Sequence, residues 1–215
     1  DPNAGGGKWE RYLYPNHTDR NRWSRLRDNL SNHMRVGPNK QCQVELLPLT
    51  NVKQDVLDKI DEMIANGVTH VNLGAVWGWR VISPGEPYTN GAAYDDDEVN
   101  KAIVIMTDGE NFVSSSSGSY SGYGLLSDGN LGTTSSSSAA ESELDDRLSE
   151  ICTNIKALDI LVYTITFQVN SSTIQNLMRN CATDSNKYFN SPSGAELERA
   201  FRAIGAELSN LRIGR

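Results

Sequence analysis

The sequence predicts an α/β fold in which a mostly parallel sheet carries helices on both faces. Short apolar runs of strand length alternate with longer segments whose apolar residues recur every three or four positions. One run, Ala102–Met106, is apolar throughout, as expected of a strand buried on both sides. The chain of 215 residues, 38% hydrophobic and 22% charged, is long enough for one sizeable core. Alternation of strands and helices favours parallel pairing.

The first part of the chain divides into an arm and the start of a domain. Residues 1–41 are rich in aromatic and basic side chains, and the domain is expected to occupy residues 42–215. A strand is expected over Gln43–Leu47 and a helix over Lys53–Asn66, with Gly67 as its cap. The net charge of -7 argues against general nucleic-acid binding, so we expect the arm to pack its aromatic residues on the domain.

The middle of the chain supplies a helix, a strand and a long polar segment. The helix is expected over Val71–Ile82, and a polar connection over Ser83–Asn100 leads to the strand Lys101–Met106. The segment Val113–Ala140 is rich in serine and glycine, a composition that does not build a core. We therefore expect a mobile surface loop there.

The last part repeats the alternation of helix and strand. A helix that carries Cys152 precedes the strand Ile160–Phe167, which we expect to lie beside Lys101–Met106 in the sheet. A short helix from Ser172 and a short strand over Lys187–Asn190 follow. The final helix is expected to bury one apolar stripe. Phe201→Ala should therefore lower the free energy of unfolding by about 3 to 5 kcal/mol, because it would leave a cavity. The stripe consists of Leu197, Ala200, Phe201, Ile204, Leu208 and Leu211.

Two oxygen-bearing side chains are candidates for a functional site. Asp108 directly follows the apolar strand, and Thr69 lies in the loop before the helix Val71–Ile82. Ligands of open α/β sheets gather beyond the carboxyl ends of parallel strands, where we expect both residues to meet. A carboxylate and a hydroxyl are hard ligands that suit Mg²⁺ or Ca²⁺. The simpler interpretations are that Asp108 belongs to a turn and that Thr69 caps a helix.

Known catalytic motifs are absent from the sequence. It contains no GxGxxG, no P-loop and no GxSxG. The three histidines, His17, His33 and His70, do not have metal-binding spacing, and we interpret His70 as a loop residue rather than a base.

The three cysteines leave one over if a pair forms. Cys152 and Cys181 lie on predicted helices that flank the strand Ile160–Phe167, so we predict a disulfide between them, worth about 3 to 4 kcal/mol. The alternative is that both are small buried core residues. Cys42 would then be free or paired with a residue outside this chain.

Several motifs together resemble a known family. Val44–Thr50 reads VELLPLT, Gly67–Thr69 leads into the LGAVWGWRVISP of Leu73–Pro84, and Met106–Asn111 reads MTDGEN. This order resembles the later part of a von Willebrand factor A domain, a Rossmann-type fold. More narrowly, it is similar to the TadG-type proteins of tight-adherence (Flp) pilus assembly, over residues 42–215.

The resemblance implies a cation site of the kind called a metal-ion-dependent adhesion site. Such domains bind a divalent cation through three loops, and Thr69 and Asp108 match the second and third. The first loop carries Asp-x-Ser-x-Ser, which does not occur in this chain. Its strand and the helix after it are also missing, so we expect the chain to be a fragment. Mg²⁺ or Ca²⁺ would bind well only if absent sequence supplies that loop, because two oxygens are too few.

The resemblance also implies a function. It suggests a non-enzymatic protein of a bacterial cell envelope, on the periplasmic or extracellular side, that serves pilus assembly or adhesion. Its partner would be another pilus or envelope protein, and it would meet the membrane only through an anchor absent from this chain. Two alternatives are a metal-dependent hydrolase that uses Asp108 and a metal-free structural interaction module.

Overall fold

The computed structural model describes residues 44–63, 68–115 and 121–211. For Leu211, the last of these residues, only the backbone is described. The predicted arm, Cys42, Gln43, Asn66 and Gly67 lie outside the described residues. The chain divides into two units, Asp1–Gly67 and Val68–Arg215, which we describe separately.

The first unit contains helix α4, Lys53–Asp61. It begins at the predicted residue and ends earlier than predicted, with Glu62 as its C-cap. The prediction of a strand over Gln43–Leu47 is wrong for its described part, since residues 44–47 form no ladder. An extended segment becomes a strand only when a neighbour pairs with its backbone, and the described residues of this unit offer none.

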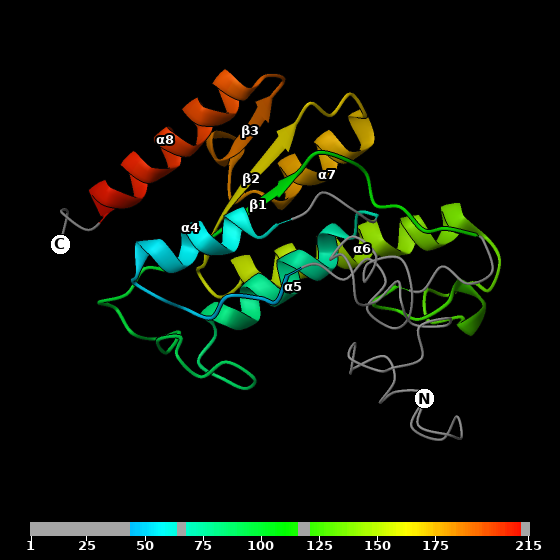
Figure 1. Cartoon of the computed structure of the whole chain (residues 1–215), viewed down its shortest axis with the longest axis horizontal. Helices are drawn as coiled ribbons and strands as arrows, with labels where there is room; N and C mark the ends of the chain where they lie inside the picture. Colours follow the sequence, from blue (N-terminus) through cyan, green and yellow to red (C-terminus); the bar gives the residue numbers. More distant parts are fainter. Residues whose placement is uncertain (1–43, 64–67, 116–120, 212–215) are drawn as a thin grey trace, which may run out of the picture. The chain divides into compact units, whose positions relative to one another are not determined.

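The second unit is built on a three-stranded parallel sheet in the order β1-β2-β3 (Figure 1). The strands are β1, Ala102–Thr107, β2, Leu161–Phe167, and β3, Tyr188–Ser191. Ile103 is the register partner of Val162, and Thr164 that of Tyr188. The prediction that the first two strands are neighbours is confirmed. The fold is α/β with a parallel sheet, and it is compatible with a Rossmann-like arrangement.

Helices pack against both faces of this sheet (Figure 1). On one face lie α5, Val71–Ile82, α6, Ser137–Lys156, and α7, Ser172–Cys181, and on the other lies α8, Gly194–Leu211. Two short 3-10 turns, Leu126–Asp128 and Ser185–Lys187, are also present. The first face buries the larger core, which comprises Val71, Ala75, Ile103, Ile105, Leu148, Cys152, Ile155, Ile160, Val162, Val169, Ile174, Met178 and Cys181.

The smaller core beneath α8 contradicts one prediction. Tyr163 and Ile165 of β2 pack with Ala200 and Ile204 of α8. Phe201 is 48% exposed, so the prediction that it belongs to the core is wrong, and its alanine variant leaves no large cavity.

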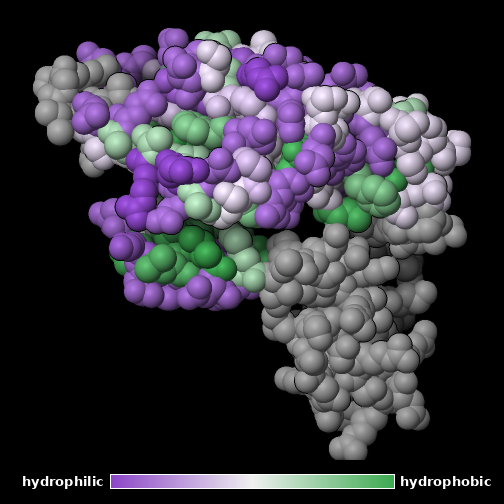
Figure 2. Space-filling view, turned by 90° about the horizontal axis from the view of Figure 1, so that it is seen from above, coloured by the Kyte–Doolittle hydropathy of each residue, from purple (hydrophilic) through white to green (hydrophobic). Residues whose placement is uncertain are grey.

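The space-filling view shows apolar patches on the molecular surface (Figure 2). Large exposed apolar side chains of this unit include Trp77, Val104, Met106, Phe112 and Phe201.

The serine- and glycine-rich segment Val113–Ala140 also differs from its prediction. Val113 and Leu131 are buried in a third cluster with Ala140 and Leu144 of α6. The helix already begins at Ser137, because the Ser136 hydroxyl accepts a hydrogen bond from Ala139 N at 3.2 Å. The described part of the segment is therefore partly core, and not only a surface loop.

The predicted disulfide is present between Cys152 of α6 and Cys181 of α7. The two Cα atoms are 5.1 Å apart, and both residues are 2% exposed. The bond joins two helices on the same face of the sheet and encloses β2 within its covalent loop.

Candidate functional site

The carboxyl end of β1 is shaped by a short turn. The Thr107 hydroxyl donates to Gly109 O at 2.8 Å and accepts from Gly109 N at 3.2 Å. Thr107 is buried, whereas the next residue, Asp108, is exposed. The turn therefore places the Asp108 carboxylate just beyond the strand, where the sequence predicts a site.

Backbone contacts hold the Thr69 loop beside this turn. Phe112 N donates to Thr69 O at 3.0 Å. On the adjacent residue, His70 Nε2 lies 3.2 Å from Phe112 O. The segment that follows β1 thus fixes the segment that precedes α5.

Asn111 completes the connection between these segments. Its Oδ1 accepts from Val71 N at 2.8 Å and supplies the cap that His70, the N-cap residue of α5, does not make with its side chain. Its Nδ2 donates to Asp145 Oδ1 at 2.7 Å. Burial raises the pKa of Asp145, and the Asn111 hydrogen bond opposes that shift. One amide therefore ties β1, α5 and α6 together behind the site.

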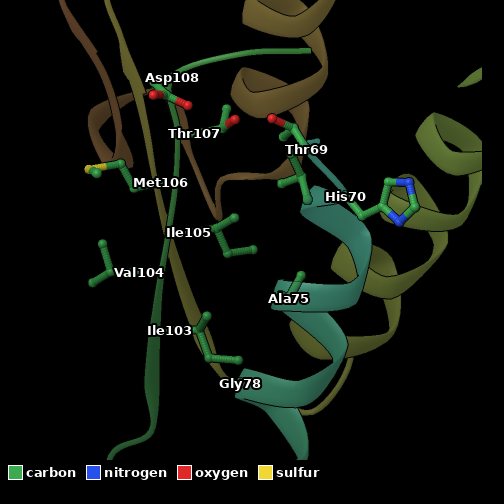
Figure 3. Close-up of a pocket in the computed structure, with 12 residues that line it drawn as sticks. Thr69, His70, Ala75, Gly78, Ile103, Val104, Ile105, Met106, Thr107 and Asp108 are labelled. Atoms are coloured by element: carbon green, nitrogen blue, oxygen red, sulfur yellow. The ribbon is translucent and has the colours of Figure 1, made fainter. Parts of the chain in front are cut away.

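Thr69 and Asp108 line the same cleft between α5 and β1, with a volume of about 480 Å³ (Figure 3). Thr69, Thr107 and Asp108 gather at one end of it (Figure 3). The rest of the lining is mainly apolar and small, and the complete lining is Thr69, His70, Val71, Gly74, Ala75, Gly78 and residues 103–108. The structure thus brings the two predicted residues to one end of one cleft.

The oxygens of this pair do not make a complete cation site. Within the part of the chain that the structure describes, neither side chain forms a hydrogen bond or ion pair. The same part holds no group of three or more histidine, cysteine, aspartate or glutamate residues that could bind a metal ion. Thr69 and Asp108 offer two oxygens where Mg²⁺ or Ca²⁺ requires about six or more.

His70 does not complete a catalytic pair with Asp108. Its ring points away from Asp108 and Thr69 (Figure 3), and it lies 6.0 Å from the Tyr123 ring, centroid to centroid. Burial lowers the pKa of His70, against the opposing effect of the Phe112 carbonyl. In this orientation the His70 ring contacts the Phe112 carbonyl and so holds the loop together.

Sequence reasoning missed two polar residues that support the site. Asn111 stood in the MTDGEN motif without an assigned role. Asn72 is fully buried in α5, and its Nδ2 donates to Tyr123 Oη at 2.6 Å. Its partner comes from the segment expected to be a loop without a core. An asparagine on the apolar helix Val71–Ile82 was the available signal, because a buried amide needs polar partners.

The fold and the cleft define an α/β protein with a candidate binding site at the carboxyl end of strand β1. No family model, curated protein or solved structure matches this chain. Among the described residues, no helix is both long and apolar enough to cross a membrane.

Proposed function

We propose that this chain is a non-enzymatic interaction module of a bacterial cell envelope, a component of pilus assembly or adhesion that resembles the TadG-type proteins. One observation carries the proposal. Thr69 and Asp108, which the resemblance assigns to two cation-binding loops, line the same cleft and keep their side-chain oxygens free of hydrogen bonds within the described residues. A protein partner would bind at this end of the cleft.

The orientation of His70 favours binding over hydrolysis. A hydrolase that uses Asp108 as base or nucleophile needs a second group to activate water or to protonate the leaving group. Among the residues that the structure describes, the one histidine is His70, and its ring faces away from Asp108 and contacts the Phe112 carbonyl. This arrangement supports recognition at the site rather than turnover.

A cation would fit the pair only with further ligands. Thr69 would contribute a hydroxyl and Asp108 a carboxylate, and a partner or absent sequence would supply the remaining oxygens. A divalent cation bound there would link the two proteins by electrostatic attraction. Binding by this chain alone should therefore be weak.

The cation part of the proposal can be tested by calorimetric titration with Mg²⁺, Ca²⁺ and Mn²⁺. The parent should give only weak binding, which Asp108→Asn and Thr69→Val remove. Asp97→Asn, which changes an exposed carboxylate that does not line the cleft, should behave like the parent. Tight binding by the parent, or binding that survives Asp108→Asn, would place any cation site elsewhere.

The partner is sought by crosslinking in cells that make the protein. A photo-reactive residue at position 108 should capture an envelope protein, whereas the same residue at position 199, on the exposed surface of α8, should not. Equal capture from both positions, or none from position 108, would reject the proposed surface.

A further inference from the structure

Strand β1 has a free edge in the described structure. It pairs with β2 on one side, and the sheet continues from β2 to β3. Leu161 N donates to Lys101 O, and parallel ladders use alternate residues of a strand. Lys101 and every second residue after it therefore bond to β2. The backbone N–H and C=O groups of Ala102, Val104 and Met106 point away from β2. Three residues of β1 are thus ready to form a second ladder.

The side chains of β1 are those of a central strand rather than an edge strand. Ala102–Thr107 contains no charge and no proline, the features with which edge strands usually prevent unwanted pairing. Val104 is 38% exposed and Met106 is 47% exposed. Both lie on the face that carries α8, where Phe201 is also exposed. Within the described part of the chain, β1 is therefore an apolar strand that is open on one edge and on one face.

The cleft supplies room for that neighbour on the opposite face. Ile103 and Ile105 point toward α5 (Figure 3), which borders the cleft with Gly74 and Gly78. A Cβ atom built on either glycine meets no atom within 4 Å. The polar residues of the cleft gather at the Asp108 end, so the space along the strand is uncharged.

We infer that the free edge of β1 binds a further β-strand, an extended and uncharged segment of about six residues with apolar side chains on both faces. Its backbone pairs with Ala102, Val104 and Met106. On one face its side chains fill the cleft beside Gly74 and Gly78, and on the other they cover Val104 and Met106. A helix or a small molecule would leave the outer N–H and C=O groups of β1 unpaired, whereas a strand satisfies them and buries both apolar faces at once. The inference is independent of the proposed cation site.

The probe is a synthetic peptide of six alternating valine and isoleucine residues, flanked by lysines for solubility and added to the full chain. Amide hydrogen exchange of Ala102, Val104 and Met106 should slow by roughly tenfold or more, because outward N–H groups become hydrogen-bonded. No slowing at saturating peptide would overturn the inference.

Two variants test the backbone edge and the cleft separately. Val104→Pro removes one outward N–H without removing a hydrogen bond to β2, and proline is tolerated on strand edges. Gly78→Leu fills the cleft, while Gly205→Leu adds the same side chain to α8, where the glycine also has free space. Val104→Pro and Gly78→Leu should each weaken peptide binding about tenfold or more, and Gly205→Leu should not. Circular dichroism verifies that each variant is folded.

Three results would count against the inference. Peptide binding unchanged in both Val104→Pro and Gly78→Leu would show that the peptide binds elsewhere. Protection of the three amides without peptide, together with dimers that Val104→Pro dissociates, would show that a second copy occupies the edge. Peptide binding retained in Asp108→Asn is expected, and its loss would tie the peptide to the proposed partner site instead of the strand edge.

Discussion

The two faces of the sheet are packed to different degrees. On the face covered by α5, α6 and α7, Leu148 and Ile155 are fully buried and a disulfide joins two of the helices. On the face covered by α8, Ala200 and Ile204 are buried, but Phe201 is 48% exposed. Both faces carry amphipathic helices, so helix type alone does not account for the difference.

The position of each helix along the sheet accounts for it. Helix α8 contacts β2 and β3. Val104 and Met106 of β1 remain exposed on the same face, as does Phe201 of α8. The apolar stripe of a helix therefore shows which residues are suited to burial. Which of them are buried depends on where the helix lies on the sheet.

The largest expected effect separates the two faces directly. Leu148→Ala should lower the free energy of unfolding by about 3 to 4 kcal/mol, because it leaves a cavity in a fully packed region. Phe201→Ala should cost less than about 1 kcal/mol, since the residue is already 48% exposed. Denaturant unfolding of both variants measures the contrast. Similar losses would show that the two faces are equally packed.

The disulfide should be the next largest contribution. Replacing both Cys152 and Cys181 by alanine should lower the free energy of unfolding by about 2 to 4 kcal/mol, because the unfolded chain loses its closed loop. The parent unfolded in the presence of reductant provides the comparison. If the double variant is as stable as the oxidised parent, the bond does not strengthen this face.

Asn111 joins the better packed face to the candidate site. Asn111→Ala should cost about 1 to 2 kcal/mol, since it removes the cap of α5 and a partner of Asp145. Asn111→Asp keeps the acceptor for Val71 N but places a second carboxylate beside Asp145. That repulsion raises the pKa of the pair further, so the variant should lose less stability at pH 5 than at pH 8. A thermal melt series across this range tests the sign, and a loss that is constant with pH would contradict it.

The smallest expected effect concerns His70. Burial lowers its pKa in the folded protein from the ordinary 6.5, so the unfolded chain binds the proton more readily. The contribution of the neutral, buried His70 ring to the free energy of unfolding is complete above pH 6.5. It decreases as the pH falls toward the folded pKa. His70→Gln should remove this part of the pH dependence. Parallel melts between pH 5 and pH 8 measure it, and identical curves would show that the ring is solvated.

The elements with strong local patterns were predictable from sequence. Helix α5 has the predicted bounds Val71–Ile82, and β1 is shifted by only one residue. The continuous apolar run of β1 and the terminal Thr-Asp-Gly sequence are local signals. The meeting of Thr69 and Asp108 followed from the general location of sites at the carboxyl ends of parallel strands.

Features that depend on distant packing were not predictable. Val113 and Leu131 are buried because Ala140 and Leu144 of α6 lie against them, and serine-rich composition hides this. The exposure of Phe201 depends on where α8 crosses the sheet. The apolar sequence of β1 predicts burial on both sides, whereas its edge is free among the described residues because only β2 pairs with it there.

The Cys152–Cys181 bond has a mechanical consequence. A pulling force applied at the two ends of the chain is carried across the bond and bypasses the residues between the two cysteines. Those residues include all of β2, so the central strand cannot be extended while the bond is intact. A span of 29 residues is withheld from extension, which at about 3.5 Å per residue is roughly 100 Å of chain. Under load, the protein would lengthen by that much less than its residue number predicts.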